Sequence, residues 1–212
     1  LTLRLLDGET IDDQTAEISG AADEMMSGAA SPVQMAAFLT ALRVRGESPK
    51  VVAAFAKVLR ERAGAFTTPE GAVLDTCGTG GDHSGTFNIS TTAAFVAAGA
   101  GVKVAKHGNR SMTSLCGSSD VLSHLGINIE AETALMERAL REVGICFLHA
   151  QQYHSSMRHV GPVRAEVGFR TVFNLLGPLC NPAGATHQVM GVYDPRLLEP
   201  LAEVLGRVAA GS

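Results

Sequence analysis

The pattern of apolar and polar positions divides this chain into a helical first third and an alternating remainder. Over residues 11–27 the apolar side chains recur at helical spacing, which predicts a helix. Ser31-Pro32 and Ser48-Pro49 each place a capping hydroxyl before a proline, so each predicts the start of another helix. Three consecutive helices predict a small bundle over residues 1–66. Such a bundle serves packing alone or, as the alternative, provides a surface for dimerisation.

Near Pro69 short apolar runs begin to alternate with helical segments, and we place a domain boundary there, with a second domain over residues 67–212. The predicted strands are residues 73–75, 102–105, 145–149 and 188–193, and the predicted helices are residues 90–98, 119–125, 133–143, 157–167 and 195–209. This alternation predicts the α/β class, with a mostly parallel sheet flanked by helices. Ligands bind such sheets outside the carboxyl ends of the strands, so the loops after Leu74 and Ala105 are candidate ligand loops.

The loop after Leu74, with the sequence Asp75-Thr76-Cys77-Gly78-Thr79-Gly80-Gly81-Asp82, predicts an anion site. Its glycines let backbone N–H groups turn into one concavity, and the next helix N-terminus adds its dipole. His83 stands where the dinucleotide fingerprint needs its third glycine, and no Walker Gly-Lys-Ser/Thr follows, so neither nucleotide motif is present. A glycine-rich turn without a ligand is the alternative. The amide and hydroxyl side chains at residues 88 and 90–92 exceed what one helix cap needs, and they favour the anion site.

A second polar loop follows Ala105, where residues 106–114 bring together two cations, an imidazole, an amide and three hydroxyls. Residues 117–120 add another hydroxyl-rich helix start. Lys106 as a point charge and Arg110 as a planar fork are natural phosphate partners. A solvated polar loop is the alternative. Two anion-binding loops at strand ends predict a ligand that carries phosphate groups at more than one position.

Arg164 lies on a partly apolar helical stretch, two residues after Pro162. A guanidinium binds a carboxylate through two parallel hydrogen bonds, so Arg164 is a candidate carboxylate clamp. An ordinary ion pair with Glu166 or Asp194 explains the residue equally well.

The histidines give a weaker signal. His107 alone is more often structural than catalytic, and neither a Ser-His-Asp arrangement nor H-E-x-x-H spacing occurs. His149, His154 and His159 have no carboxylate at metal-ligand spacing, which argues against a zinc site.

Composition narrows the function classes further. The net charge of −4 argues against a nucleic-acid partner, because nucleic-acid binding relies on a cationic surface. The four cysteines form no C-x-x-C pair, which predicts reduced thiols and a cytoplasmic location. No apolar run reaches membrane-spanning length, so we expect no membrane partner.

Six segments together resemble one family, the anthranilate phosphoribosyltransferases of the nucleoside-phosphorylase-like class. The Lys-His-Gly-Asn-Arg and Phe-Asn-Leu-Leu-Gly-Pro-Leu segments are specific to the family, whereas the glycine loop alone is not. The order and spacing of the segments match the family along nearly the whole chain. The matching segments are Gly78-Thr79-Gly80-Gly81-Asp82, Asn88-Ile89-Ser90-Thr91, Lys106-His107-Gly108-Asn109-Arg110, Gly117-Ser118-Ser119-Asp120, His159-Val160-Gly161-Pro162-Val163-Arg164 and Arg170-Thr171-Val172-Phe173-Asn174-Leu175-Leu176-Gly177-Pro178-Leu179.

The resemblance implies transfer of a phosphoribosyl group from phosphoribosyl pyrophosphate to the amine of anthranilate in tryptophan biosynthesis, with Mg²⁺ and release of pyrophosphate. It also implies a homodimer formed through the helical domain. It assigns Gly78, Asn109 and Arg164 to anthranilate and Ser90 to Mg²⁺, and it names no certain catalytic residue. It assigns to the sugar-phosphate substrate Gly78, Gly81, Asp82, Thr86, Asn88, Ile89, Ser90, Thr91, Lys106, His107, Gly108, Asn109, Arg110, Ser111, Met112, Thr113, Ser114 and Ser118.

One departure from the family pattern concerns the metal. Family members continue beyond this point and carry an adjacent Asp-Glu pair that binds magnesium, whereas this chain stops at Ser212 without that pair. Because Mg²⁺ prefers one or two carboxylates besides phosphate oxygens, we expect residues 1–212 alone, with a truncated sheet, to turn over little or not at all. Two alternatives stay open: a pyrimidine nucleoside phosphorylase of the same fold, and a non-catalytic binding module.

Overall fold

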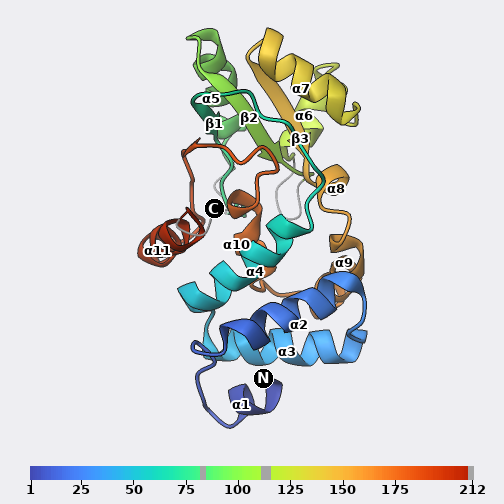
Figure 1. Ribbon diagram of the computed structural model, residues 1–212, viewed down its shortest axis with the longest axis vertical. Coiled ribbons are helices and arrows are strands. Elements are labelled where there is room, and N and C mark those ends of the chain that lie inside the picture. The colour runs from blue at the N-terminus through green and yellow to red at the C-terminus, as the bar shows by residue number, and fades with distance from the viewer. Residues whose placement is uncertain (82–84, 111–115, 210–212) are drawn as a thin grey trace. The chain divides into compact units, whose positions relative to one another are not determined.

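The computed structural model describes residues 1–81, 85–110 and 116–209, which fall into two compact units (Figure 1). The helical unit combines Leu1–Arg62, His154–Cys180 and residues 196–209, and the sheet unit combines Ala63–Tyr153 and Asn181–Pro195. Each unit is therefore built from segments that are distant in sequence. The predicted domains 1–66 and 67–212 are a different division of the chain, and that division stays a prediction.

The helical unit contains the predicted bundle and additional helices from later in the chain. Ser31 caps α3, because its hydroxyl accepts from the Gln34 N–H while the Gln34 amide oxygen accepts from the Ser31 N–H. Ser48 caps α4 in the same position, so both Ser-Pro predictions are confirmed. The helices are α1 (Thr2–Leu6), α2 (Thr15–Ser27), α3 (Pro32–Arg45), α4 (Pro49–Glu61), α9 (Met157–Val167), α10 (Phe173–Leu176) and α11 (Leu198–Ala209), with 3-10 turns at Gly177–Leu179 and Pro195–Leu197.

Phe55 of α4 lies at the centre of the helical unit and is fully buried. Its ring stacks on Phe38 of α3 at 6.4 Å between centroids and meets Phe173 of α10 edge-to-face at 5.5 Å. Aromatic pairs in these geometries stabilise a core beyond the area they bury. The later segment therefore joins the core of the first three long helices.

The sheet unit confirms the predicted α/β class. Its four strands lie in the order β3-β2-β1-β4, and all three pairings are parallel. The strands are β1 (Val73–Asp75), β2 (Lys103–Gly108), β3 (Ile145–His149) and β4 (His187–Gln188), and the helices are α5 (Ile89–Gly99), α6 (Ser118–His124), α7 (Thr133–Glu142) and α8 (Ala150–Tyr153).

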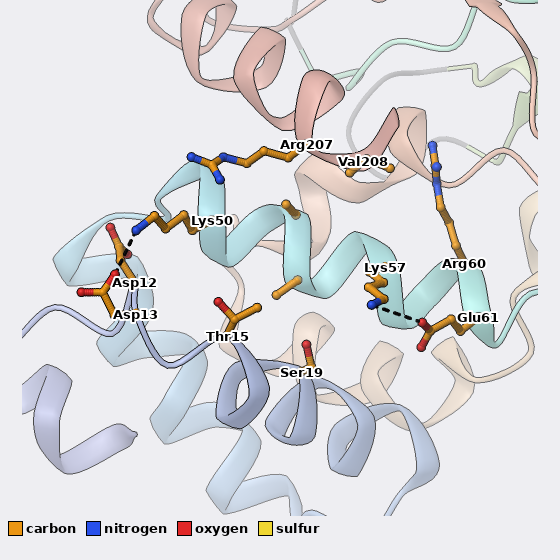
Figure 2. Close-up of a pocket in the computed structure, with 12 residues that line it drawn as sticks. Asp12, Asp13, Thr15, Ser19, Lys50, Lys57, Arg60, Glu61, Arg207 and Val208 are labelled. Carbon is orange, nitrogen blue, oxygen red and sulfur yellow. Dashed lines mark hydrogen bonds and ion pairs between the residues drawn. The ribbon is translucent and has the colours of Figure 1, made fainter. Parts of the chain in front are cut away.

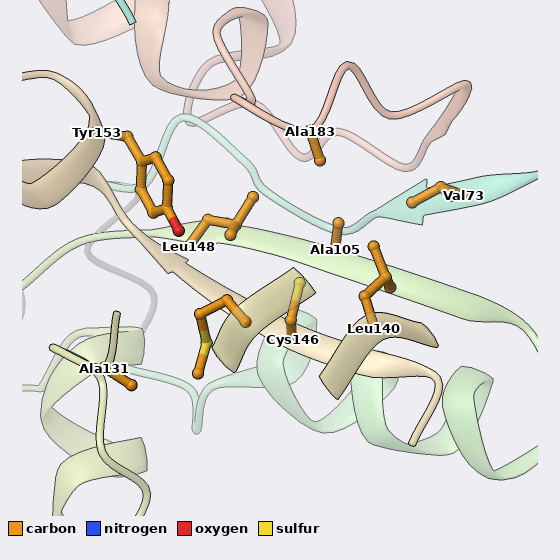
Figure 3. Packing of buried hydrophobic residues seen from close by; sticks show 9 residues of the cluster. Val73, Ala105, Ala131, Leu140, Cys146, Leu148, Tyr153 and Ala183 are labelled. Carbon is orange, nitrogen blue, oxygen red and sulfur yellow. The ribbon is translucent and has the colours of Figure 1, made fainter. Parts of the chain in front are cut away.

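The core of this unit lies between the sheet and α7 (Figure 3). Val73, Ala105 and Leu148 of three neighbouring strands belong to one buried cluster with Leu140 of α7. Alternate strand residues face the opposite side, where Phe147 packs with Leu122 of α6 and with Ile129. The sheet is thus covered on both faces, as parallel sheets usually are. None of the described helices is long and apolar enough to span a bilayer.

Two strand predictions are wrong. The strand predicted to end at Ala105 runs on to Gly108, because β3 lies beside it and pairs Lys106 with Phe147 and Gly108 with His149. The strand predicted at residues 188–193 is only His187–Gln188. After it the chain turns toward the glycine loop, where the Gly191 carbonyl accepts from the Thr79 N–H at 2.9 Å.

Candidate functional site

The candidate site begins at the carboxyl edge of the sheet, where parallel strands bring their ends together. Lys106 of β2 lies beside the first residue after β1, with its Nζ 3.3 Å from both the carbonyl oxygen and the hydroxyl of Thr76. The Thr76 hydroxyl donates in turn to the Ser90 carbonyl at 2.8 Å. The glycine loop, the end of β2 and the start of α5 therefore meet at Thr76.

Lys106, His107 and Gly108 were predicted in a polar loop, and this prediction is wrong. All three belong to β2, and Lys106 and His107 are only 3% and 2% exposed. Burial lowers the pKa of Lys106 below its ordinary value, and the neighbouring Cys77 and Asp75 offset this only in part. Lys106 is thus a buried side chain that hydrogen-bonds to Thr76, rather than a solvated one.

Asp75, which the sequence analysis did not single out, is the fully buried carboxylate at the end of β1. Its Oδ1 accepts from the Cys77 N–H at 3.1 Å and from the His107 N–H at 3.2 Å. Burial raises its pKa above the ordinary value, and the hydrogen bonds from His107 and Cys77 together with the charge of Lys106 offset this only in part. A single acidic residue at the end of a strand matches no sequence motif. Only its contacts in the structure show that it belongs to the site.

The glycine loop has part of the backbone geometry predicted for an anion site. Gly80 and Gly81 adopt φ of 64° and 71°, which glycine reaches without strain. Gly78 cannot be replaced, because a Cβ there would lie 2.7 Å from the Gly191 carbonyl oxygen. The N–H groups of Cys77 and Thr79 are already used by Asp75 and Gly191. The predicted concavity therefore has fewer available donors than the sequence suggested.

The start of α5 presents a mixed set of side chains. Asn88 occupies the N-cap position but makes no side-chain capping bond, and Ser90 is exposed. Thr86 is also exposed, and Ile89 is 55% exposed. Thr91 instead points into the unit, where it is 4% exposed. Of this set, Thr86, Ile89 and Ser90 are therefore open to a ligand from solvent, whereas Thr91 is not.

After β2, two of the predicted site residues, Asn109 and Ser118, hydrogen-bond to each other. The Ser118 hydroxyl donates to the Asn109 carbonyl at 3.3 Å, and Gly108 leaves room for it because a Cβ there would overlap the Ser118 Oγ. Arg110 does not project as an unpaired fork: its guanidinium lies 3.7 Å from Asp120 and 4.0 Å from Glu130. Five predicted residues lie outside the described residues, namely Asp82, Ser111, Met112, Thr113 and Ser114.

Arg164 belongs to α9 of the helical unit, where its guanidinium carbon lies 5.7 Å from the Phe173 ring centroid. Burial lowers its pKa. Within the described part of the helical unit Arg164 forms no ion pair, so the predicted pairing with Glu166 does not occur. A half-buried guanidinium stacked on a ring is a suitable binding group for a carboxylate.

A separate surface groove runs along α4 of the helical unit and contains none of the predicted site residues (Figure 2). Most of its charged side chains already form ion pairs or hydrogen bonds within the helical unit. Lys50 lies 2.9 Å from Asp13, Lys57 lies 4.0 Å from Glu61, and the Arg60 Nε donates to the Leu179 carbonyl at 2.6 Å. This groove is therefore not the candidate site.

Comparison with known proteins matches both parts of the chain. Residues 1–63 match the family described as the glycosyl transferase family, helical bundle domain, and residues 70–212 match the glycosyl transferase family, a/b domain. An anthranilate phosphoribosyltransferase of Roseiflexus sp. (strain RS-1) is 58% identical over 196 residues, which are 92% of this chain and 56% of that protein.

Two solved structures share the fold. The anthranilate phosphoribosyltransferase of Thermus thermophilus is 47% identical with a TM-score of 0.92, covering 98% of this chain and 63% of that one. The Saccharomyces cerevisiae enzyme, in complex with phosphoribosyl pyrophosphate and Mg, is 30% identical with a TM-score of 0.87, covering 100% and 62%. This chain therefore spans less than two thirds of the length of each of these relatives.

Proposed function

We propose that this chain, which belongs to the glycosyl transferase family with helical-bundle and α/β domains, is part of an enzyme that transfers phosphoribosyl from phosphoribosyl pyrophosphate to the amine of anthranilate. The observation that carries the proposal is the buried Lys106 at the carboxyl edge of the sheet, 3.3 Å from Thr76 at the start of the glycine loop. Its relatives named anthranilate phosphoribosyltransferase support the choice of both substrates.

The chemistry suits this edge of the sheet. Departure of pyrophosphate leaves an oxocarbenium-like ribose, so the main demand is to stabilise negative charge on the leaving group. Lys106 supplies a fixed positive charge in a buried place, where such a charge acts more strongly than in water. We assign the phosphoribosyl pyrophosphate site to the predicted residues of the glycine loop, the start of α5, the end of β2 and Ser118.

Mg²⁺ is part of the proposal, and one described residue suits it. Ser90 is exposed at the start of α5 and offers one neutral oxygen. Within the described residues no three histidines, cysteines or carboxylates gather, so most ligands would come from substrate phosphates, water and other segments of the protein. When bound, Mg²⁺ neutralises charge on the pyrophosphate. The test of this assignment is whether Ser90→Ala weakens Mg²⁺-dependent binding of phosphoribosyl pyrophosphate.

Arg164 is proposed to hold the anthranilate carboxylate, with Gly78 and Asn109 as further contacts. A bound carboxylate orients the neighbouring amine toward the anomeric carbon, which is a proximity effect. An aryl amine is neutral near pH 7, so the reaction requires no strong general base, and we assign no catalytic acid or base.

We also propose that the protein forms a cytoplasmic homodimer through the helical unit, and that residues 1–66 and 67–212 are its domains. Leu3 and Leu6 of α1 and Val33 and Val44 of α3 are 68–79% exposed, which is typical of an apolar contact surface. The four cysteines are free thiols, which supports a reducing compartment. Sedimentation of the unaltered protein and of a Val33→Glu, Val44→Glu variant tests the dimer, because only the variant should be monomeric.

A coupled assay of the complete protein tests the function. We expect pyrophosphate release that requires both anthranilate and phosphoribosyl pyrophosphate, together with Mg²⁺. Phosphate-dependent release of a base from a nucleoside would instead support a pyrimidine nucleoside phosphorylase. The same assay on residues 1–212 alone should give little or no turnover, and full activity would contradict that expectation.

A further inference from the structure

We propose that Asp75 is a positioning residue, which holds the glycine loop and the end of β2 in the arrangement that binds the pyrophosphate end of the donor substrate. This inference rests on the proposed function and adds to it a residue outside the predicted site. Asp75 is fully buried, so it acts through its neighbours.

The first observation is the set of groups that Asp75 joins. Pairing between β1 and β2 ends at Leu74 and Val104, whereas β2 continues to Gly108. The His107 N–H therefore lies beyond the last pair with β1, where a buried N–H needs an acceptor from outside the ladder. The Asp75 carboxylate accepts from it and from the Cys77 N–H, while the Asp75 carbonyl accepts from the Val189 N–H at 2.9 Å.

The second observation is electrostatic. Asp75 and Lys106 are both buried, and burial shifts the pKa of each toward its neutral form, whereas the charge of each opposes that shift in the other. Burying such a pair contributes little stability compared with apolar side chains of similar size. The carboxylate is therefore poorly explained by folding alone. It is well explained by a need to keep Lys106 cationic where negative charge develops on the leaving group.

The third observation shows how a small shift would spread. Thr76, the residue after Asp75, accepts from the Lys106 ammonium at its carbonyl and hydroxyl and donates to the Ser90 carbonyl. Moving Asp75 would thus move Lys106 and the start of α5 together. An error of about 1 Å in such a site can reduce the rate about a hundredfold.

Two substitutions of Asp75 in the complete protein separate geometry from charge. Asp75→Asn keeps an oxygen that accepts both N–H groups but removes the charge, and we expect its KM for phosphoribosyl pyrophosphate to rise about tenfold. Asp75→Ala removes both, and we expect kcat/KM for that substrate to fall about a hundredfold. The KM for anthranilate should change far less in both variants. The thermal stability of Asp75→Asn should fall, because Lys106 is left buried without its counter-charge.

Thr186→Val is the matched control, because Thr186, which directly precedes β4, binds the amino end of β1 through its side chain. The Thr186 hydroxyl accepts from the Val73 N–H at 2.9 Å and donates to the Val73 carbonyl at 3.3 Å. Loss of this hydroxyl should lower stability, because the Val73 N–H loses its side-chain acceptor, yet both KM values should stay unchanged.

The outcomes distinguish the inference from its premise. Equal changes in KM for both substrates would show a merely structural role and overturn the inference. Normal kinetics in both Asp75 variants would overturn it as well. An unaltered protein that releases no pyrophosphate with both substrates would overturn the proposed function, and the inference with it.

Discussion

The helical unit and the carboxyl edge of the sheet bury different kinds of side chain. The most deeply buried positions of the helical unit are apolar, as at Ile18, Leu39 and Phe55. The sheet edge instead buries Asp75 and Lys106, at 0% and 3% exposed. Ionisable groups are costly to desolvate. The apolar core of the helical unit therefore serves stability, whereas the buried charges at the sheet edge serve chemistry at a cost in stability. The difference indicates where function resides.

Lys106→Met should give the largest effect and sharpen this contrast. We expect kcat/KM for phosphoribosyl pyrophosphate to fall about a thousandfold, because the proposed counter-charge to the leaving group is lost. The free energy of unfolding should fall as well, since the buried Asp75 carboxylate loses its counter-charge. Initial rates of pyrophosphate release and urea unfolding measure the two quantities. Retained activity would contradict the assignment.

Phe55→Ala should affect stability alone. Loss of the fully buried ring and its contacts with Phe38 and Phe173 should lower the free energy of unfolding by about 4 kcal/mol. The kcat/KM of the folded fraction should not change. Phe169→Ala, at a ring that is 39% exposed, is the matched control and should cost far less. A loss of activity in folded Phe55→Ala protein would break the comparison.

His154 is a buried ionisable side chain of the helical unit, and it predicts a pH dependence. Burial lowers its pKa to about 4, while its Nε2 lies 2.9 Å from the Cys180 carbonyl. The unfolded chain binds a proton near pH 6.5 that the folded chain takes up only near pH 4. Stability should therefore be complete above about pH 6.5 and fall by about 3 kcal/mol as the pH drops between these values. Urea unfolding from about pH 7 to about pH 4 measures this slope.

His154→Gln should flatten the slope, whereas His124→Gln, at an exposed position on α6, should leave it unchanged. An unchanged slope in His154→Gln would assign the pH dependence to other groups.

Arg164→Ala should change the kinetics with anthranilate only. We expect the KM for anthranilate to rise about a hundredfold, because a carboxylate loses a charge-assisted, two-bonded partner. The KM for phosphoribosyl pyrophosphate should change little. Arg138→Ala, which removes an exposed arginine paired with Glu142, is the control and should change neither. Equal effects on both substrates would count against the carboxylate role.

Local signals in the sequence predicted most of the helices. Ser31-Pro32 and Ser48-Pro49 lie at the starts of α3 and α4 because capping depends on adjacent residues. The strands were predicted less well, because their ends depend on distant partners. Lys106 looked like a loop residue, yet pairing with β3 keeps it in the sheet. The short helix α10 carried no usable pattern.

The candidate site was predicted in composition rather than in arrangement. The glycine loop and the Lys-His-Gly-Asn-Arg segment could be recognised in the sequence, and the structure brings Lys106 to Thr76. The burial of Lys106 and the ion pairs of Arg110 could not be read from spacing. Asp75 was missed for the same reason, since its partner His107 is 32 residues away in the sequence.

The most direct test of whether the carboxyl edge of the sheet binds the donor substrate is hydrogen exchange. It is measured on the complete protein with and without phosphoribosyl pyrophosphate and Mg²⁺. We expect slower exchange of backbone N–H groups over residues 76–81 and 106–110, with little change in α2, α3 and α4. Protection confined to the helical unit, in a protein that binds the donor, would contradict this expectation.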